Sequence, residues 1–163
     1  MRTLLLVAVI AMTVGSRARI DGQAGHDGLE GVWRFVREVD IGPDRDVLSI
    51  GPKDGYEGFL IYTADGHMSA TLMPRGRSWK TTAASADELR ETLELGTAYA
   101  GTYEVRPASH EVRHFPLAAM DPADVGTSLS REYTIDGDRL TLTGPFRYDG
   151  KMMTFTVTFE RVK

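Results

Sequence analysis

The chain contains no cysteine among its 163 residues. Disulfide bonds, thiolate metal ligands and cysteine nucleophiles are therefore excluded, and so is a lipid anchor on an N-terminal cysteine. A chain of this length can bury one hydrophobic core but leaves no room for a second domain. We therefore expect a single domain whose stability depends on core packing and hydrogen bonding alone.

Long apolar runs are absent beyond the first residues. Residues 3–14 are apolar apart from two threonines, follow Arg2 and precede small residues. This order is typical of a secretory signal peptide, and the run is shorter than the about 20 residues that a membrane span needs. We expect residues 1–24 to comprise a cleaved signal and a short N-terminal segment. Residues 25–163 are then the domain, and the protein is exported to the periplasm or secreted.

The sequence also lacks a tract rich in lysine and arginine, and its formal net charge is −4 at pH 7. Proteins that bind nucleic acid or anionic lipid surfaces usually carry a basic patch or run, so we expect neither partner. A Gly-rich phosphate-binding loop and a nucleophile elbow are missing as well. We therefore predict no cofactor.

What the sequence does contain is alternating, β-prone segments joined by turns. Asp-Gly pairs at residues 65–66, 136–137 and 149–150 each separate two such segments, and Asp-Gly favours the positive φ angles of tight hairpins. About eight strands are expected in all, at residues 32–39, 58–63, 68–73, 99–106, 111–117, 130–135, 139–143 and 153–162. Sequential hairpins in that number leave exposed edges unless the sheet closes on itself. We therefore predict an all-β fold, an antiparallel and mostly up-and-down eight-stranded barrel.

One segment, residues 86–95, has the pattern of a helix. Ser85 and Glu88 have the spacing of a capping box, and Leu89 and Leu93 lie one turn apart. We expect this short helix to lie across one end of the barrel.

The order of short motifs along the chain is also informative. The chain carries Leu29-x-Gly31-x-Trp33-Arg34, the run from Gly58 to Ala70, Tyr99-Ala100-Gly101-Thr102-Tyr103, Leu129-x-Arg131-x-Tyr133 and Phe159-Glu160-Arg161. Together they resemble the bacterial and fungal lipocalin-like domain family over residues 29–162. The resemblance implies a calycin-type barrel, a fold that often encloses a small apolar ligand, and it supplies no catalytic residues.

The same resemblance implies a structural role for Trp33 and Arg161, which would close one barrel end with the guanidinium packed across the indole. Strand alternation agrees, because Arg161 shares the parity of Val157 and Phe159 and so points inward. A guanidinium in that position needs an aromatic face or hydrogen-bond acceptors.

The segment from His110 to His114 matches the His-Glu-x-x-His pattern of zinc proteases. That pattern requires a helix, on which residues four apart lie about 5–6 Å from each other. Here Pro116 follows closely and the flanking residues favour a strand. On a strand the two histidines lie about 13 Å apart, too far to share one ion, so we predict no metal site.

Four polar side chains form the candidate ligand-binding set, because each shares the alternation of an apolar neighbour on its own strand. They are Tyr62, Tyr103, His114 and Arg131. Two interpretations of His114 stay open: it exchanges a proton with or orients a ligand, or it is satisfied by a neighbouring hydroxyl or carbonyl. Arg131 is paired either with an internal carboxylate or tyrosines, or with an acidic or carbonyl group of a ligand.

Three functions fit such an interior. The leading hypothesis is a non-enzymatic binder of a small apolar or amphipathic molecule, because an eight-stranded barrel holds its side chains and at most one small ligand. The second is an enzyme that isomerises or cyclises a small hydrophobic substrate, with His114 or a tyrosine as proton donor and Arg131 stabilising negative charge. The third is a structural or interaction module of the cell envelope with a packed interior.

Overall fold

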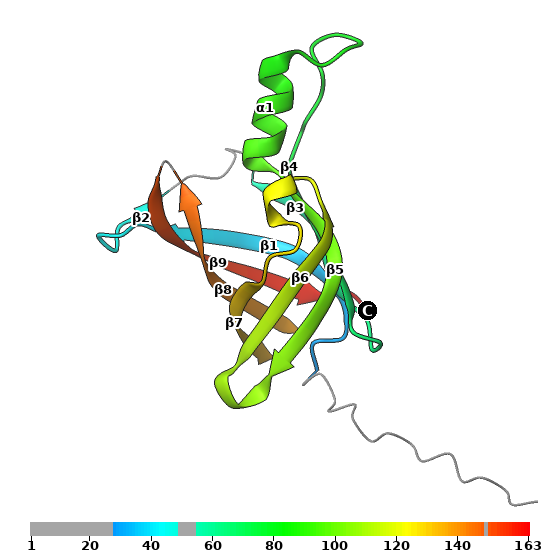
Figure 1. Ribbon diagram of the computed structural model, residues 1–163, viewed down its shortest axis with the longest axis vertical. Helices are drawn as coiled ribbons and strands as arrows, with labels where there is room; N and C mark the ends of the chain where they lie inside the picture. The colour runs from blue at the N-terminus through cyan, green and yellow to red at the C-terminus, as the bar shows by residue number, and fades with distance from the viewer. Residues whose placement is uncertain (1–27, 49–54, 149) are drawn as a thin grey trace, which may run out of the picture.

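The computed structural model describes residues 28–48, 55–148 and 150–163. Within them the chain forms one antiparallel sheet with the order β2-β1-β3-β4-β5-β6-β7-β8-β9, and β1 also pairs with β9. This last pairing closes the sheet into a barrel of eight strands, with β2 attached beside β1 (Figure 1). The predicted antiparallel, up-and-down barrel is confirmed.

The strands are β1 (Gly31–Ile41), β2 (Val47–Leu48), β3 (Tyr56–Tyr62), β4 (His67–Pro74), β5 (Thr97–Arg106), β6 (Glu111–Ala119), β7 (Leu129–Asp136), β8 (Arg139–Tyr148) and β9 (Lys151–Arg161). Helix α1 (Ala86–Leu95) joins β4 to β5, and the 3-10 turns η1 (Pro107–Ser109) and η2 (Pro122–Asp124) precede β6 and β7. Every predicted strand overlaps one of these, whereas the two residues of β2 are too few for alternation to reveal. The predicted signal segment lies outside the described residues.

The hairpin turns lie where the Asp-Gly pairs predicted them, although the aspartates do not take the positive φ angles that the glycines take. Gly66 and Gly137 have φ angles of +86° and +58°, in the left-handed region that glycine favours. Asp65 and Asp136 do not have positive φ. Only the glycine of each pair therefore supplies the turn conformation; Asp149 of the third pair lies outside the described residues.

Helix α1 begins with the predicted capping box. The Glu88 N–H donates to Ser85 Oγ at 3.2 Å, and the Ser85 N–H donates to Glu88 Oε2 at 2.8 Å. The structure describes the whole of α1, and none of its residues is buried. Leu89 and Leu93 are 51% and 54% exposed. The helix stands at the barrel end next to β4 and projects away from it, without packing across the opening (Figure 1). No helix within the described ranges is long and apolar enough to span a membrane.

One end of the barrel, which we call the Trp33 end, is sealed by its own side chains. Trp33 and Leu29 are fully buried, and the Trp33 indole N–H donates to the Leu29 carbonyl at 2.7 Å. The Arg161 guanidinium lies 4.0 Å from the centroid of the indole ring and donates to the carbonyls of Gly28 and Glu30 at 2.6 Å each. Arg161 therefore covers the indole and also satisfies two backbone acceptors.

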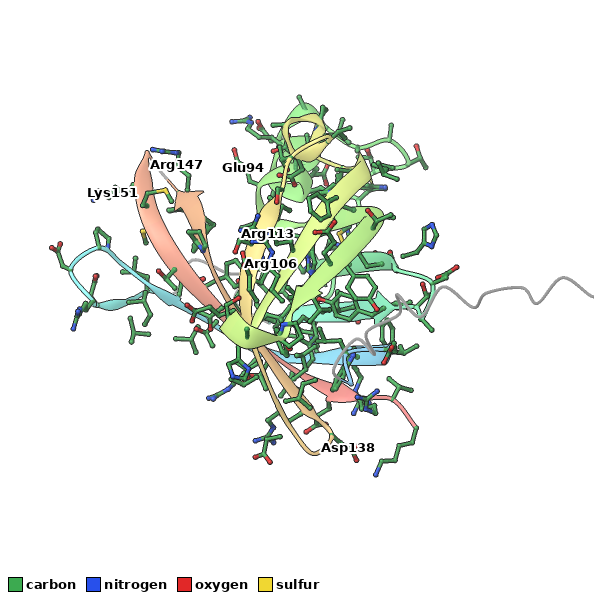
Figure 2. All side chains as sticks on the ribbon, turned by 60° about the horizontal axis from the view of Figure 1, so that its bottom comes forward. Glu94, Arg106, Arg113, Asp138, Arg147 and Lys151 are labelled. Atoms are coloured by element: carbon green, nitrogen blue, oxygen red, sulfur yellow. The ribbon has the colours of Figure 1, made fainter. Side chains whose placement is uncertain are left out.

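The opposite end, which we call the helix end, is open between β7 and β8. Pairing between these strands ends at Glu132 and Thr143, while β8 continues to Tyr148 paired with β9 alone. The β8–β9 hairpin consequently leans away from β6 and β7 (Figure 1), with Arg147 and Lys151 near its tip (Figure 2). Some inward-facing residues at this end, Arg131 and Phe155 among them, keep partial exposure to solvent.

Candidate functional site

The centre of the site is a histidine held between two tyrosines. Strand β6 directs His114 inward, where it is 1% exposed. Its Nε2 lies 2.6 Å from the Tyr62 hydroxyl on β3, and its Nδ1 lies 2.8 Å from the Tyr99 hydroxyl on β5. Three strands therefore contribute one hydrogen-bonded row across the inward face.

The two hydrogen bonds of this row have a defined donor-to-acceptor direction because His114 is neutral at physiological pH. Burial, followed by the nearby charge of Arg131, lowers its pKa to about 3. A neutral imidazole has one N–H donor and one acceptor nitrogen.

The acceptor nitrogen follows from the surroundings of Tyr62. Tyr62 is enclosed, and within the described residues its hydroxyl bonds only His114. The Tyr62 O–H must donate to Nε2, since an enclosed donor without an acceptor is costly. The Nδ1–H then donates to Tyr99 Oη, and the Tyr99 O–H is left to donate to another acceptor.

Arg131 lies next to this row at the opening between β7 and β8. Its guanidinium carbon is 4.8 Å from the centroid of the Phe155 ring, and its Nη1 donates to the Ser130 carbonyl at 2.8 Å. Burial raises the pKa of Tyr99, and Arg131 beside the hydroxyl partly offsets that rise. Among the described residues no carboxylate lies within ion-pair distance of Arg131. The guanidinium therefore rests on an aromatic face, and the Asp124 carboxylate of η2 acts on it only from beyond ion-pair distance.

A glycine on β8 makes room for this arginine. A Cβ added to Gly144 would lie 2.8 Å from Arg131 Cδ and 3.1 Å from Phe155 Cζ. Any side chain at this position would displace the guanidinium from its place over the ring.

The structure places Tyr103 apart from the other three predicted residues. Its ring packs 4.6 Å, centroid to centroid, from that of Tyr62, but its hydroxyl donates to the Thr63 carbonyl at 3.0 Å. Thr63 belongs to the β3–β4 turn, so the Tyr103 hydroxyl faces the Trp33 end. The structure thus brings Tyr62, His114 and Arg131 together, and Tyr103 supports them through its ring.

Tyr99 was missed at the sequence level, although a signal for it exists. Tyr99 and Tyr103 share the same alternation on β5, with Gly101 between them. A Cβ at Gly101 would lie 2.0 Å from the Phe115 carbonyl oxygen, so β6 approaches the backbone closely there. The alternation alone was sufficient to place both tyrosines inward.

A second inward-facing polar group was also missed, because a β-bulge conceals it. Between Phe35 and Arg37 strand β1 holds one extra residue relative to β9, which reverses its alternation. Glu38 and Asp40 consequently pair with Val157 and Phe155 and face inward with them. The uninterrupted alternation of Trp33 and Phe35 would instead have placed residues 37 and 39 inward.

This acidic pair is poorly solvated. Burial raises the pKa of Glu38 to about 7, with a further contribution from Asp40. Burial also raises the pKa of Asp40, which is 6% exposed and whose Oδ1 has no hydrogen-bond partner. The two carboxylates also act on the Tyr56 hydroxyl of β3. Burial, followed by the charges of Glu38 and Asp40, raises the pKa of Tyr56 to about 12. Glu38, Asp40 and Tyr56 therefore form one electrostatically coupled group.

The His-Glu-x-x-His segment does not form a metal site. Glu111 to His114 lie on a strand, as predicted, while His110 is an exposed residue of the preceding turn with φ +51°. Across the part of the chain that the structure describes, no three histidine, aspartate or glutamate side chains gather as metal ligands.

These features define a small, closed antiparallel β-barrel with one sealed end and one polar, partly solvated end. Residues 30–162 match the lipocalin-like domain family, and the chain belongs to that family. No curated protein and no solved structure matches it.

Proposed function

We propose that this lipocalin-like protein binds a small amphipathic molecule at the helix end of the barrel, with a carboxylate or carbonyl group of the ligand held by Arg131 and Tyr99. The observation that carries the proposal is the half-buried guanidinium of Arg131, which rests on Phe155 with no carboxylate in ion-pair distance among the described residues. A partly desolvated cation gains from an anionic partner within ion-pair distance, and the described residues supply only Asp124 of η2, which acts on Arg131 from farther away.

The neighbouring groups suit the two parts of such a ligand. The Tyr99 O–H is left to donate beside the guanidinium, so a carboxylate there gains a charge-assisted and a neutral hydrogen bond. Partly buried apolar residues, Leu72 and Phe155 among them, line the inward face beside the polar groups. An apolar tail lying against them leaves the carboxylate at Arg131.

The test compares ligands that share a tail and differ in head group. Decanoate and decanol are titrated calorimetrically into the protein and into the variant Arg131→Gln. Loss of a hydrogen bond to a charged group corresponds to about tenfold or more in affinity, so R131Q should weaken decanoate binding by that factor and change decanol binding little. Arg90→Gln on α1, at a side chain that is 62% exposed, removes the same charge and is the matched control. Equal decanoate affinity in R131Q and R90Q would contradict the proposal.

One observation favours an isomerising enzyme as a second candidate. The row Tyr62–His114–Tyr99 ends in a hydroxyl donor beside a cation, an arrangement that can polarise and protonate a carbonyl oxygen. With its pKa near 3, His114 would orient Tyr99 and would not itself donate the proton.

The two candidates differ in what Tyr99→Phe does. For an enzyme acting on an enolisable ketone, Y99F should abolish exchange of the α-hydrogens with deuterium while ketone binding persists through Arg131. Wild-type protein without any exchange above the solvent rate would exclude this second candidate for that substrate class.

A further inference from the structure

The acidic pair on β1 is a second binding element at the same end of the barrel. Asp40 is 6% exposed and its Oδ1 has no hydrogen-bond partner, so an enclosed acceptor faces the interior unsatisfied. Glu38 lies two residues away on the same inward face. An enclosed acceptor without a donor costs free energy that a ligand donor would recover.

No cation of the chain fills this role in the described residues. The ion pairs that the described residues form all involve other carboxylates, and none involves Glu38 or Asp40. Arg37, the residue before Glu38, faces outward because the bulge reverses the alternation. As far as the described residues go, the acceptors of the pair are thus left for a group from outside the protein.

The surroundings of the pair are aromatic. The Tyr56 ring packs edge to face against Phe35, with centroids 5.7 Å apart. Phe155 is the register partner of Asp40 and shares its face of the sheet. Carboxylates beside aromatic faces suit an organic ammonium group, which gains ion pairing, hydrogen bonds and cation–π contact together. A divalent metal ion would need more ligands than the described residues gather here.

We infer that Glu38 and Asp40 form a subsite for a protonated amine, so that the natural ligand is an amphipathic molecule with a basic nitrogen. The inference rests on the proposed function in that the ligand enters the same barrel end. It adds that this end has two chemically opposite subsites, Arg131 for an acidic or carbonyl group and Asp40 for an amine. Phe155 lies between them, stacked under Arg131 and paired across the sheet with Asp40.

The experiment titrates decylamine and decanoate separately into the full chain at pH 8 by isothermal calorimetry. Asp40→Asn and Glu38→Gln should each weaken decylamine binding about tenfold or more and leave decanoate binding within about twofold. Arg131→Gln should show the reverse pattern. Glu57→Gln, on the exposed face of β3, is the matched control and should bind both probes as the wild type does.

The decanoate titration also reports whether each variant folds, so loss of decylamine binding with retained decanoate binding is a specific effect. Wild-type protein that binds decylamine no tighter than decanol would overturn the inference, as would D40N and E38Q proteins with wild-type decylamine affinity. Stabilisation by calcium chloride alone that D40N abolishes would also overturn it, in favour of a metal site. Decylamine binding without decanoate binding would support the amine subsite and contradict the proposed role of Arg131.

Discussion

Replacing Glu38 by glutamine should stabilise the ligand-free protein at alkaline pH and leave it nearly unchanged in acid. Burial raises the pKa of Glu38 in the folded chain to about 7, from an ordinary value of 4.5. Below pH 4.5 the carboxyl is protonated in both states. Between the two values the folded state keeps a proton that the unfolded state has lost, so the stability contributed by this group is present below 4.5 and lost as the pH rises through 7.

The size of the effect follows from that difference in pKa. One pKa unit corresponds to about 1.4 kcal/mol of stability. Because the Glu38 side chain is partly solvated, we reduce the effect of its whole pKa shift to on the order of 2 kcal/mol. Glutamine does not titrate and has almost the same shape. The free energy of unfolding of E38Q minus that of the wild type should therefore increase by on the order of 2 kcal/mol between pH 4.5 and pH 8.

Urea denaturation at pH 4.5, 6, 7 and 8 measures this difference directly. His114 acts in the opposite direction, since its lowered pKa costs stability as the pH falls below 6.5 towards 3, but it is present in both proteins and cancels in the difference. Glu57→Gln on the exposed face of β3 supplies the control and should run parallel to the wild type. Parallel curves for E38Q and the wild type would refute the inward placement of Glu38.

Three further substitutions test other parts of the structure. Tyr62→Phe should lower the free energy of unfolding by about 1–3 kcal/mol, because His114 Nε2 loses its partner in the interior; a change below about 0.5 kcal/mol in urea denaturation would mean that the hydrogen bond is not formed. Arg161→Lys should cost about 1–3 kcal/mol, since a single ammonium cannot both cover Trp33 and reach two carbonyls; thermal denaturation of the variant indistinguishable from the wild type would argue against that closure. Leu93→Ser on α1 should change stability by less than about 0.5 kcal/mol because the side chain is more than half exposed, and a large loss would show that the helix packs against something.

The strands were predictable because each depends on local signals. Alternation over several residues sets which face is apolar, and glycines such as Gly66 and Gly137 mark the reversals. Closure of the barrel was predictable as well, because so many sequential hairpins have few other ways to cover the two edge strands of the sheet. The pairing of Trp33 with Arg161 was implied by family resemblance and strand parity together, and the contact is present.

The acidic subsite was not predictable, for a specific physical reason. Parity is counted along one strand, while a bulge is defined by the partner strand, so one extra residue at Val36 inverts the orientation of everything after it on β1. Glu38 and Asp40 consequently resemble ordinary surface acids in the sequence. A similar limit applies to Tyr103, whose inward parity was evident, whereas the direction of its hydroxyl depends on the β3–β4 turn.

The two ends of the barrel show that polar lining is not imposed by the fold. At the Trp33 end the strands enclose a core that is apolar apart from Arg161, whereas farther along the barrel they direct Arg131, His114 and two acids inward. Leucine or valine at those positions would avoid the desolvation that charged and polar groups suffer. The backbone also makes local provision for them, with the bulge at Val36 for the acids and Gly144 for Arg131. Because this cost is carried in the free protein and relieved when opposite charges enter, a ligand that satisfies Asp40 and Arg131 should raise the free energy of unfolding in proportion to its occupancy.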